Sequence, residues 1–156
     1  MRNINIKIGG KAGEGVKITG LILTKALSRN DYSTFAYQEY PSLIRGGHNT
    51  YQVYASIDKA YSQVKKIDIL IAFDQNTIKL HQKELSKSSL IIYDAEIIKL
   101  PFKITGKYLA IPLKKIAVKN GNRLMANTVS LGAVCGLINL PIGKLQEVLK
   151  QVVMTY

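Results

Sequence analysis

Short apolar stretches alternate along this chain with longer stretches whose apolar residues recur at helical spacing. Asn3–Ile8 alternates polar and apolar residues, as a strand with one buried face does. Val16–Ser28 carries isoleucine, leucine and alanine residues along one side of a helix, which predicts an amphipathic helix. Ile67–Phe73 is almost continuously apolar, a pattern typical of a strand buried on both faces. The hydrophobic pattern therefore predicts strands and helices in alternation.

The remaining apolar stretches extend this alternation to the end of the chain. Further strands are predicted at Tyr32–Tyr37, His48–Ser56, Ser89–Tyr93 and Tyr108–Ile111. Further helices are predicted after Asp74, which is expected to cap its helix, over Asn122–Ile138 and after Pro141. The pattern predicts one domain over residues 1–156, an α/β three-layer sandwich with a mostly parallel sheet and flanking helices. The strands on either side of residues 39–49 are expected to form a local antiparallel pair.

A glycine-rich segment, Gly9–Gly15, separates the first predicted strand from the first predicted helix. Its spacing is neither the dinucleotide-binding pattern G-x-G-x-x-G nor a P-loop. Two interpretations stay open. The glycines serve only close packing of strand on helix, or they expose backbone N–H groups that hold an anionic cofactor. The second predicts cofactor contacts at Gly10, Lys11, Gly13 and Gly15, although the charge of Glu14 opposes a phosphate there.

The segment over residues 39–49 gathers flexible backbone and hydrogen-bonding side chains between two predicted strands. Arg45 carries a planar fork of donors that suits a carboxylate or a phosphate. One interpretation is a hairpin turn with a solvated arginine, and the other is a binding loop held by a rigid scaffold. The binding interpretation predicts substrate contacts at Ser42, Arg45, Gly46, Gly47, His48 and Asn49.

The net charge of +12 is large for 156 residues. It suits a nucleic-acid surface, a site for an anionic cofactor or a face that meets acidic partner subunits. The lysines are scattered, and no arginine-rich tract or nucleic-acid recognition motif accompanies them, so a nucleic-acid partner is not expected. No apolar run reaches the roughly 20 residues of a membrane helix, and the first residues lack the apolar region of a signal peptide. We therefore expect no membrane partner and a cytoplasmic location.

Metal and cluster chemistry are not expected of this chain alone. Cys135 is the single cysteine, so the chain can form no internal disulfide and cannot supply the four thiolates of an iron–sulfur cluster. Cys135 lies in an apolar run and is expected to be a small core residue. The two histidines, His48 and His81, lie far apart in the sequence without a metal-binding motif.

Several of these segments together resemble a known family. The chain has a Gly-Lys-Ala-Gly-Glu-Gly-Val segment at 10–16, Tyr-Pro-Ser-Leu-Ile-Arg-Gly-Gly at 40–47, Asp-Ile-Leu-Ile-Ala-Phe-Asp at 68–74, and Asn127 followed by Leu-Gly-Ala at 131–133. In this order, over almost the entire chain, they resemble the gamma subunit or gamma domain of the 2-oxoacid:ferredoxin (acceptor) oxidoreductases. The 40–47 segment looks most like the form that is fused at the N-terminus of the alpha subunit.

The resemblance implies a role in a multi-subunit enzyme. Family members oxidatively decarboxylate a 2-oxoacid such as pyruvate to an acyl-CoA and pass the electrons to ferredoxin. The complexes use thiamine diphosphate, Mg²⁺, iron–sulfur clusters and coenzyme A, and the thiamine diphosphate lies between alpha and beta components. The resemblance therefore implies that this chain alone binds none of these cofactors and supplies no catalytic residue. Its expected partners are alpha and beta components, with a ferredoxin-like delta component as a further partner and ferredoxin reached indirectly.

The resemblance also gives the two candidate sites a context. One hypothesis is that the 39–49 loop docks at the mouth of the alpha–beta active site. There Ser42 would hydrogen-bond the 2-oxoacid or line its entrance, Arg45 would contact a carboxylate of substrate or partner, and His48 and Asn49 would hold the loop shape or the interface. A second hypothesis is that the glycine turn, with Lys11 and Lys17, contacts phosphates of coenzyme A. The competing interpretation is an independent nucleotide- or anion-binding α/β module. Which 2-oxoacid is used cannot be read from the sequence, because other chains build most of the substrate pocket.

Overall fold

The computed structural model describes residues 2–40, 47–100, 104–122 and 125–153. Its elements begin with a strand, a helix and two antiparallel strands. A strand, two short helices and two further strands follow, and the chain ends in helices. In chain order they are β1 (Asn3–Lys11), α1 (Val16–Ser28), β2 (Ser33–Glu39), β3 (His48–Ser56), β4 (Ile67–Ala72), α2 (Gln75–His81), the 3-10 helix η1 (Gln82–Glu84), β5 (Leu85–Tyr93), β6 (Lys107–Ala110), α3 (Leu113–Lys119), α4 (Ala126–Leu137) and α5 (Ile142–Val153).

The six strands form one sheet in the order β2-β3-β1-β4-β5-β6. β1 pairs in parallel with β4, β4 with β5 and β5 with β6. β3 pairs antiparallel with both β1 and β2, so the expected local antiparallel pair around residues 39–49 is present. The start of β3 consequently lies beside the carboxyl end of β1, where Asn49 is opposite Gly10 and His48 is opposite Lys11.

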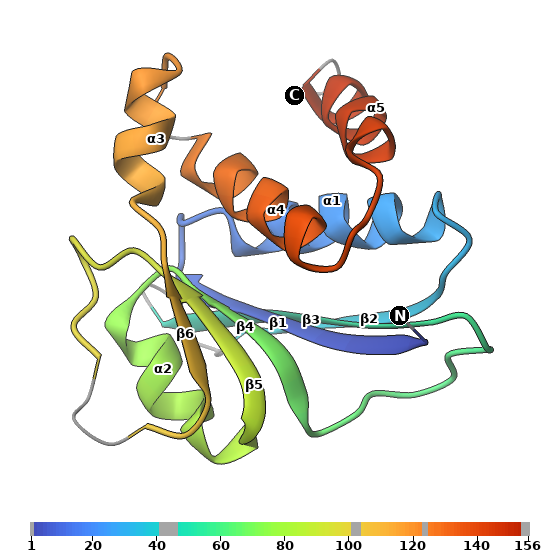
Figure 1. Cartoon of the computed structure of the whole chain (residues 1–156), viewed down its shortest axis with the longest axis horizontal. Helices are drawn as coiled ribbons and strands as arrows, with labels where there is room; N and C mark the ends of the chain where they lie inside the picture. The colour runs from blue at the N-terminus through green and yellow to red at the C-terminus, as the bar shows by residue number, and fades with distance from the viewer. Residues whose placement is uncertain (1, 41–46, 101–103, 123–124, 154–156) are drawn as a thin grey trace.

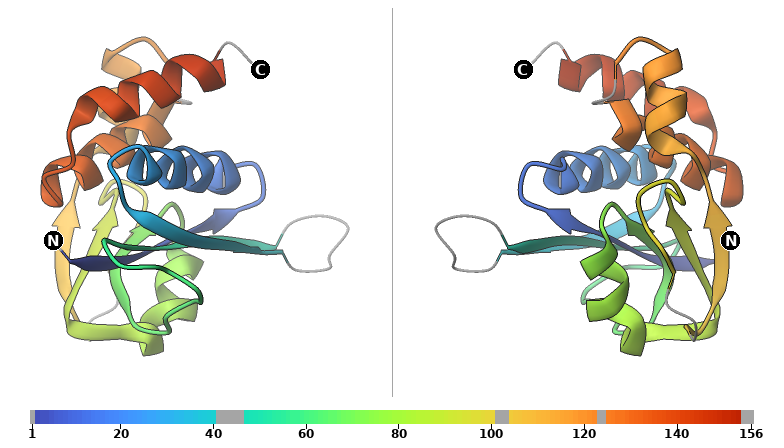
Figure 2. Two further views of the ribbon diagram at one scale, coloured as in Figure 1. Left: turned by 90° about the vertical axis from the view of Figure 1, so that its right-hand side faces the viewer. Right: turned by 90° about the vertical axis from the view of Figure 1, so that its left-hand side faces the viewer.

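Helices cover the sheet on both faces, as predicted for a three-layer sandwich. Figure 1 shows α1, α4 and α5 on one side of the sheet and α2 on the other, and Figure 2 shows the same layers edge-on. The ends of β2 and β3 that adjoin residues 41–46 project beyond the helices (Figure 2). None of the helices in the described ranges combines the length and apolar character that a membrane crossing requires.

The two faces of β1 differ in chemistry, and this difference divides the interior. Ile4, Ile6 and Ile8 point toward α1 and the C-terminal helices and belong to the larger core cluster. Asn5 and Lys7 point to the other face, where both are almost fully buried. Beneath β4 and β5 a smaller apolar cluster includes Ile78, Leu70 and Ile91, with Ile78 contributed by α2. The face under β1 is therefore buried but polar.

The structure confirms several local predictions. The Asp74 side chain caps α2 by accepting a hydrogen bond from the Thr77 backbone N–H at 2.8 Å. Cys135 is buried in the larger core cluster. Gly20 lies where any Cβ would overlap the ring of Tyr51 on β3, so this glycine lets α1 pack closely on the sheet. The Asp74 cap and the buried position of Cys135 were both expected from the sequence.

Other boundaries differ from the sequence prediction. β1 extends to Lys11, so Gly9 and Gly10 are strand residues and the turn occupies only residues 12–15. The ladder to β3 explains the extension, because Gly9 and Gly10 pair with Thr50 and Asn49 of that strand. Helix α3 (Leu113–Lys119) was not predicted, and α4 begins at Ala126 rather than Asn122.

Candidate functional site

The glycine turn joins the carboxyl end of β1 to α1. Gly13 and Gly15 have φ of 91° and 74°, a left-handed conformation that favours glycine. Gly15 is the residue before the first turn of α1, and its carbonyl accepts a hydrogen bond from the Thr19 backbone at 3.0 Å. A Cβ on Gly13 would meet no atom within 4 Å, so the space next to this part of the turn is open.

The carboxylate of Glu14 folds back over the turn. It accepts a hydrogen bond from the backbone N–H of Lys11 at 2.8 Å, and a Cβ on Gly10 would lie 2.6 Å from its Oε2. Gly10 thus leaves the room that this carboxylate occupies. Burial raises the pKa of Glu14 above its usual value and the charge of Asp74 adds to the rise, while the hydrogen bond from Lys11 opposes it. Part of the anion-binding capacity of the turn is therefore used by the protein's own carboxylate.

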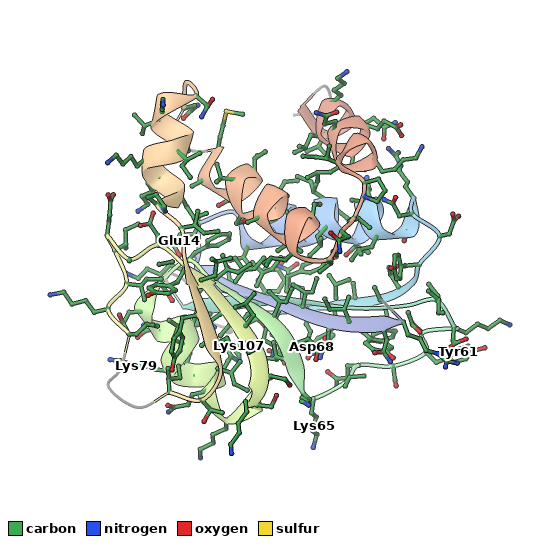
Figure 3. All side chains as sticks on the ribbon, viewed as in Figure 1. Glu14, Tyr61, Lys65, Asp68, Lys79 and Lys107 are labelled. Carbon is green, nitrogen blue, oxygen red and sulfur yellow. The ribbon has the colours of Figure 1, made fainter. Side chains whose placement is uncertain are left out.

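A pocket of about 360 Å³ opens beside this turn. It lies at the carboxyl ends of β1, β4 and β5, the usual place for ligands in open α/β sheets. Figure 3 shows Glu14 where α3 and α4 approach that edge of the sheet. The pocket is lined by the glycine turn, the ends of two strands and the starts of two helices: Gly13, Glu14, Gly15, Ala72, Phe73, Asp94, Ile97, Leu113, Lys114, Ala126 and Asn127.

Two side chains from outside the turn fix the walls of the pocket. Asn127, in the first turn of α4, donates its side-chain amide to the carbonyl oxygen of Glu14 at 2.9 Å. Asp94, which follows β5 and is 3% exposed, accepts hydrogen bonds from the backbone N–H groups of Glu96 and Lys114 at 3.0 Å each. Asp94 thereby fixes the start of α3. Walls held by such hydrogen bonds form a pocket that is built before any ligand arrives.

A second polar cluster lies under the sheet, on the side of α2. His48 and His81 approach Nε2 to Nε2 at 3.0 Å, and His81 Nδ1 lies 2.6 Å from Glu84 Oε1. The Nζ of buried Lys7 donates to Glu84 Oε2 at 2.6 Å. Burial lowers the pKa of His48 below its usual value, and the neighbouring His81 adds to the fall.

The predicted site residues fall into three groups. Gly13 and Gly15 line the pocket, while Gly10 and Lys11 lie in β1 next to it. Gly47, His48 and Asn49 lie at or just before the start of β3, and the Gly47 carbonyl accepts from the Ala12 backbone at 3.4 Å. The predictions for Ser42, Arg45 and Gly46 lie outside the described residues.

Sequence reasoning missed the roles of several residues that the fold brings to these sites. Asp94 carried a usable signal, because it directly follows a buried strand just as Asp74 does. Lys114 lies in the helix that was not predicted, although Pro112 followed by an apolar and lysine pattern favours a helix start. His81, Glu84 and Lys7 carry no local pattern that links them, because their contacts span two layers of the fold.

The donor groups of the described residues do not suit a metal centre. Within residues 2–40, 47–100, 104–122 and 125–153, no three His, Cys, Asp or Glu side chains converge to form a metal site. The single thiol, Cys135, is buried in the core, where burial raises its pKa. These residues do not fit an iron–sulfur cluster.

Comparison with protein families connects this geometry to known enzymes. The model of the family "pyruvate ferredoxin/flavodoxin oxidoreductase" matches residues 5–155. The chain belongs to this family. Both the β1 glycine turn and the C-terminal helices that frame the pocket fall inside the matched region. The predicted resemblance is thereby confirmed.

Among the relatives of this chain are one subunit of similar length and one that is much longer. The chain is 23% identical over 152 residues to 2-oxoglutarate synthase subunit KorC of Archaeoglobus fulgidus, covering 96% of this chain and 79% of that protein. It is 28% identical over 137 residues to ketoisovalerate oxidoreductase subunit VorA of Methanothermobacter marburgensis, covering 87% of this chain but 29% of that one. The chain therefore spans most of the first relative and less than a third of the second.

Solved structures agree with the family assignment. The 2-oxoglutarate:ferredoxin oxidoreductase of Magnetococcus marinus, solved with 2-oxoglutarate, coenzyme A and succinyl-CoA bound, matches with a TM-score of 0.90 and 26% identity, over 99% of this chain and 28% of that one. The gamma subunit of the keto/oxoacid ferredoxin oxidoreductase of Geobacter sulfurreducens has the same fold, with a TM-score of 0.79 and 23% identity over 94% of this chain and 84% of that one.

Proposed function

We propose that this chain is the gamma component of a multi-subunit 2-oxoacid:ferredoxin oxidoreductase that converts a 2-oxoacid and coenzyme A to an acyl-CoA and carbon dioxide, with electrons passed to ferredoxin. The observation that carries the proposal is the match of nearly the whole chain, at a TM-score of 0.90, to part of an enzyme with substrate and coenzyme A bound. Thiamine diphosphate, Mg²⁺ and iron–sulfur clusters would be held by the alpha, beta and delta components. The gamma chain would shape the site without being catalytic.

The pocket is the part of this chain best suited to a ligand or a partner side chain. It combines apolar walls such as Phe73 and Leu113 with a few fixed polar groups, the composition that ligand sites usually have. The open space at Gly13 gives access to the turn, and Lys114 supplies a positive charge on the opposite wall. The surplus positive charge of the chain favours an anionic ligand or an acidic partner.

Within this proposal, we hypothesise that the phosphates of coenzyme A contact the glycine turn. Lys11 and Lys17 are exposed and can meet a phosphate without a desolvation cost. The N–H of Lys11 already serves Glu14, however, so a phosphate bound there must displace this carboxylate. Titration calorimetry of coenzyme A with complex that carries Lys11→Ala tests the contact, and an unchanged affinity would remove it.

The substrate role of the 39–49 segment is tested by kinetics of the reconstituted complex. Ser42→Ala and Arg45→Ala are expected to raise the KM for the 2-oxoacid or to lower kcat. Lys79→Ala is a suitable control, because this lysine is exposed on α2 and does not line the pocket. Unchanged KM and kcat in both test variants would exclude the substrate role of the segment.

An independent nucleotide- or anion-binding module is the second candidate function. It is favoured by the pocket of about 360 Å³ that the glycine turn and residues such as Phe73 and Asn127 line at the carboxyl ends of the strands. That function predicts micromolar binding of coenzyme A or a nucleotide by the isolated chain. The gamma-subunit function predicts negligible binding by the chain alone and tight association with alpha and beta components, which co-purification and an absorbance scan for iron–sulfur clusters would detect.

A further inference from the structure

Four titratable side chains under the sheet form a continuous chain of contacts, which we call the relay: Lys7, Glu84, His81 and His48. They come from β1, η1, α2 and β3, so the relay ties four elements together. Lys7 is 3% exposed and His81 is 7% exposed, which removes both from solvent. Buried groups of this kind are retained only when they are paired.

The contacts of the relay fix where its protons lie. Lys7 is a donor only, so the 2.6 Å contact orients Glu84 as a carboxylate acceptor. The other oxygen of Glu84 lies 2.6 Å from His81 Nδ1, much closer than the 3.4 Å that separates this nitrogen from Lys7 Nζ, so we assign the Nδ1 proton to the Glu84 contact. The Nε2 of neutral His81 is left as an acceptor, and His48 must donate its own Nε2–H across the 3.0 Å contact. With both rings neutral, this assigns the Nδ1–H tautomer to His81 and the Nε2–H tautomer to His48.

This assignment leaves one unpaired acceptor on His48. Among the described residues, its Nδ1 is buried and has no hydrogen-bond partner, and the same holds for Asp74 Oδ2. Both lie close to Gly9, since a Cβ on Gly9 would lie 3.0 Å from His48 Cε1 and 2.6 Å from the methyl group of Thr77, whose hydroxyl is bonded to Asp74. The absent side chain of Gly9 is what lets His48 reach His81 beneath β1.

The relay holds the edge of the sheet that carries the candidate site. His48 is the first residue of β3 and is opposite Lys11, the last residue of β1. The preceding residue, Gly47, accepts a hydrogen bond from Ala12 in the glycine turn. A movement of His48 away from His81 would therefore displace both the start of β3 and one side of the turn.

We propose that His81 is a positioning residue, and that its Nε2 contact with His48 is a proton-controlled latch that holds the start of β3 and the adjoining glycine turn in their binding geometry. When both imidazoles are neutral, or when only one of them is protonated, one Nε2 can donate and the other can accept, and the contact is preserved. When both imidazoles are protonated, each Nε2 carries a hydrogen, and the two donors repel each other across the contact. The role in substrate or coenzyme A binding rests on the proposed function, whereas the latch itself does not.

The charges that face His48 place the opening of the latch on the acid side. They are His81 of α2, Asp74 before α2, Lys7 of β1 and Glu39 of β2, with Glu84 behind His81. Burial, then the charges of His81 and Lys7, lower the pKa of His48, while Asp74 and Glu39 oppose the fall. Hydrogen bonds from Lys7 and His81 outweigh burial and lower the pKa of Glu84, which stays ionised. The lowered pKa of His48 thus places its protonation, and with it the opening of the latch, on the acid side of neutral pH.

The latch can be tested directly because the chain contains only two histidines. Long-range ¹H–¹⁵N correlation spectra of the ¹⁵N-labelled chain report which nitrogen of each ring is protonated. At neutral pH we expect the Nδ1–H tautomer for His81 and the Nε2–H tautomer for His48, with the pKa of His48 below its usual value. The same tautomer on both rings, or a His48 pKa that is not lowered, would refute the latch.

The positioning role is tested with matched variants in the complex with alpha and beta components. His81→Leu removes the acceptor, and His81→Gln keeps an acceptor that cannot be protonated. Gln82→Ala, at the exposed neighbouring position, is the control. We expect His81→Leu to raise the KM for 2-oxoacid or coenzyme A about fivefold at neutral pH with kcat unchanged, the effect of losing one hydrogen bond. In the wild type, KM should rise in this way only at acid pH. In His81→Gln, KM should rise neither at neutral nor at acid pH.

The outcomes separate the latch from the proposed function. If KM depends on pH in the same way in wild type and in His81→Gln, the positioning role is refuted. This holds even if the spectra show the expected tautomers of His48 and His81. That comparison does not depend on whether His81→Leu folds. If the wild-type chain does not assemble with alpha and beta components, the proposed function fails, while the spectra of the chain alone still decide whether the latch exists.

Discussion

Asn127, in the first turn of α4, donates its side-chain amide to the backbone carbonyl of Glu14 at 2.9 Å, across 113 residues of sequence. The amide occupies the position that a Cβ on Gly15 would need, so the two residues are matched in shape as well as in hydrogen bonding. This contact joins the glycine turn to the C-terminal helices. Through it, the two walls of the pocket form one unit.

Removal of this amide is expected to loosen the pocket. Asn127→Ala should lower the free energy of unfolding by about 1 kcal/mol, the usual contribution of one such hydrogen bond. Urea denaturation followed by circular dichroism measures the change. Asn76→Ala, at an exposed position of α2, is the matched control and should shift stability by less than about 0.5 kcal/mol. Equal stability of the two variants would show that the contact does not hold the turn.

Glu14 is expected to compete with anionic ligands for the glycine turn. Its carboxylate takes the Lys11 N–H, and Glu14→Gln removes the negative charge while keeping a similar shape. We expect tighter binding of coenzyme A by complex that carries Glu14→Gln, measured by titration calorimetry. Weaker binding would indicate that the carboxylate itself contacts the ligand. Exposed Glu96→Gln provides a control for the change in net charge.

The raised pKa of Glu14 also predicts the sign of a pH effect on stability. A carboxyl whose pKa is raised by folding favours its protonated form, so its stabilising contribution is present below 4.5 and is lost as the pH rises through the folded-state value. Glu14→Gln cannot ionise. The stability of this variant relative to wild type should therefore increase between acid and neutral pH, as thermal unfolding over that range would reveal. A constant difference would contradict the shift.

Glycines in α1 and α4 are expected to respond oppositely to the same substitution. Gly20→Ala should destabilise the chain by about 1–3 kcal/mol, because the new methyl group overlaps the Tyr51 ring. Gly132→Ala meets no atom within 4 Å and should stabilise the chain by about 0.5–1 kcal/mol through its better helix propensity. If Gly132→Ala nevertheless weakens assembly with alpha and beta components in co-purification, the small residues of α4 face a partner backbone.

The cap of α2 provides a prediction that is independent of the pocket. Asp74→Ala should cost about 1 kcal/mol of stability, since the Thr77 N–H loses its acceptor. Asp74→Asn retains a side-chain oxygen and should recover most of the loss. Asp58→Ala, which removes an exposed ion pair with Arg2, should have little effect. Denaturation curves of the three variants distinguish capping from a general effect of charge.

Periodicity was sufficient to predict most elements of the sheet and of the helices that pack on it. Ile67–Phe73 and His48–Ser56 were placed within a residue of β4 and β3, because the apolar run of β4 and the alternating apolar residues of β3 are strong local patterns. Helix α3 was missed because it is short, and only Leu113 and Ala117 are buried along it. The burial of the polar face of β1 was also not predicted, since Asn5 and Lys7 look like solvent-facing positions in an alternating strand.

The sequence by itself determined the fold class, the family and the two glycine-bearing segments, because hydrophobic period, turn residues and motif order are local properties. Only the tertiary structure decided that Glu14 occupies the glycine turn, that Asn127 closes it, and that His48 meets His81 beneath Gly9. Each of these contacts depends on the layer and register in which distant segments pack. Side chains far apart in sequence become partners only when the sheet order brings their backbones within hydrogen-bond reach.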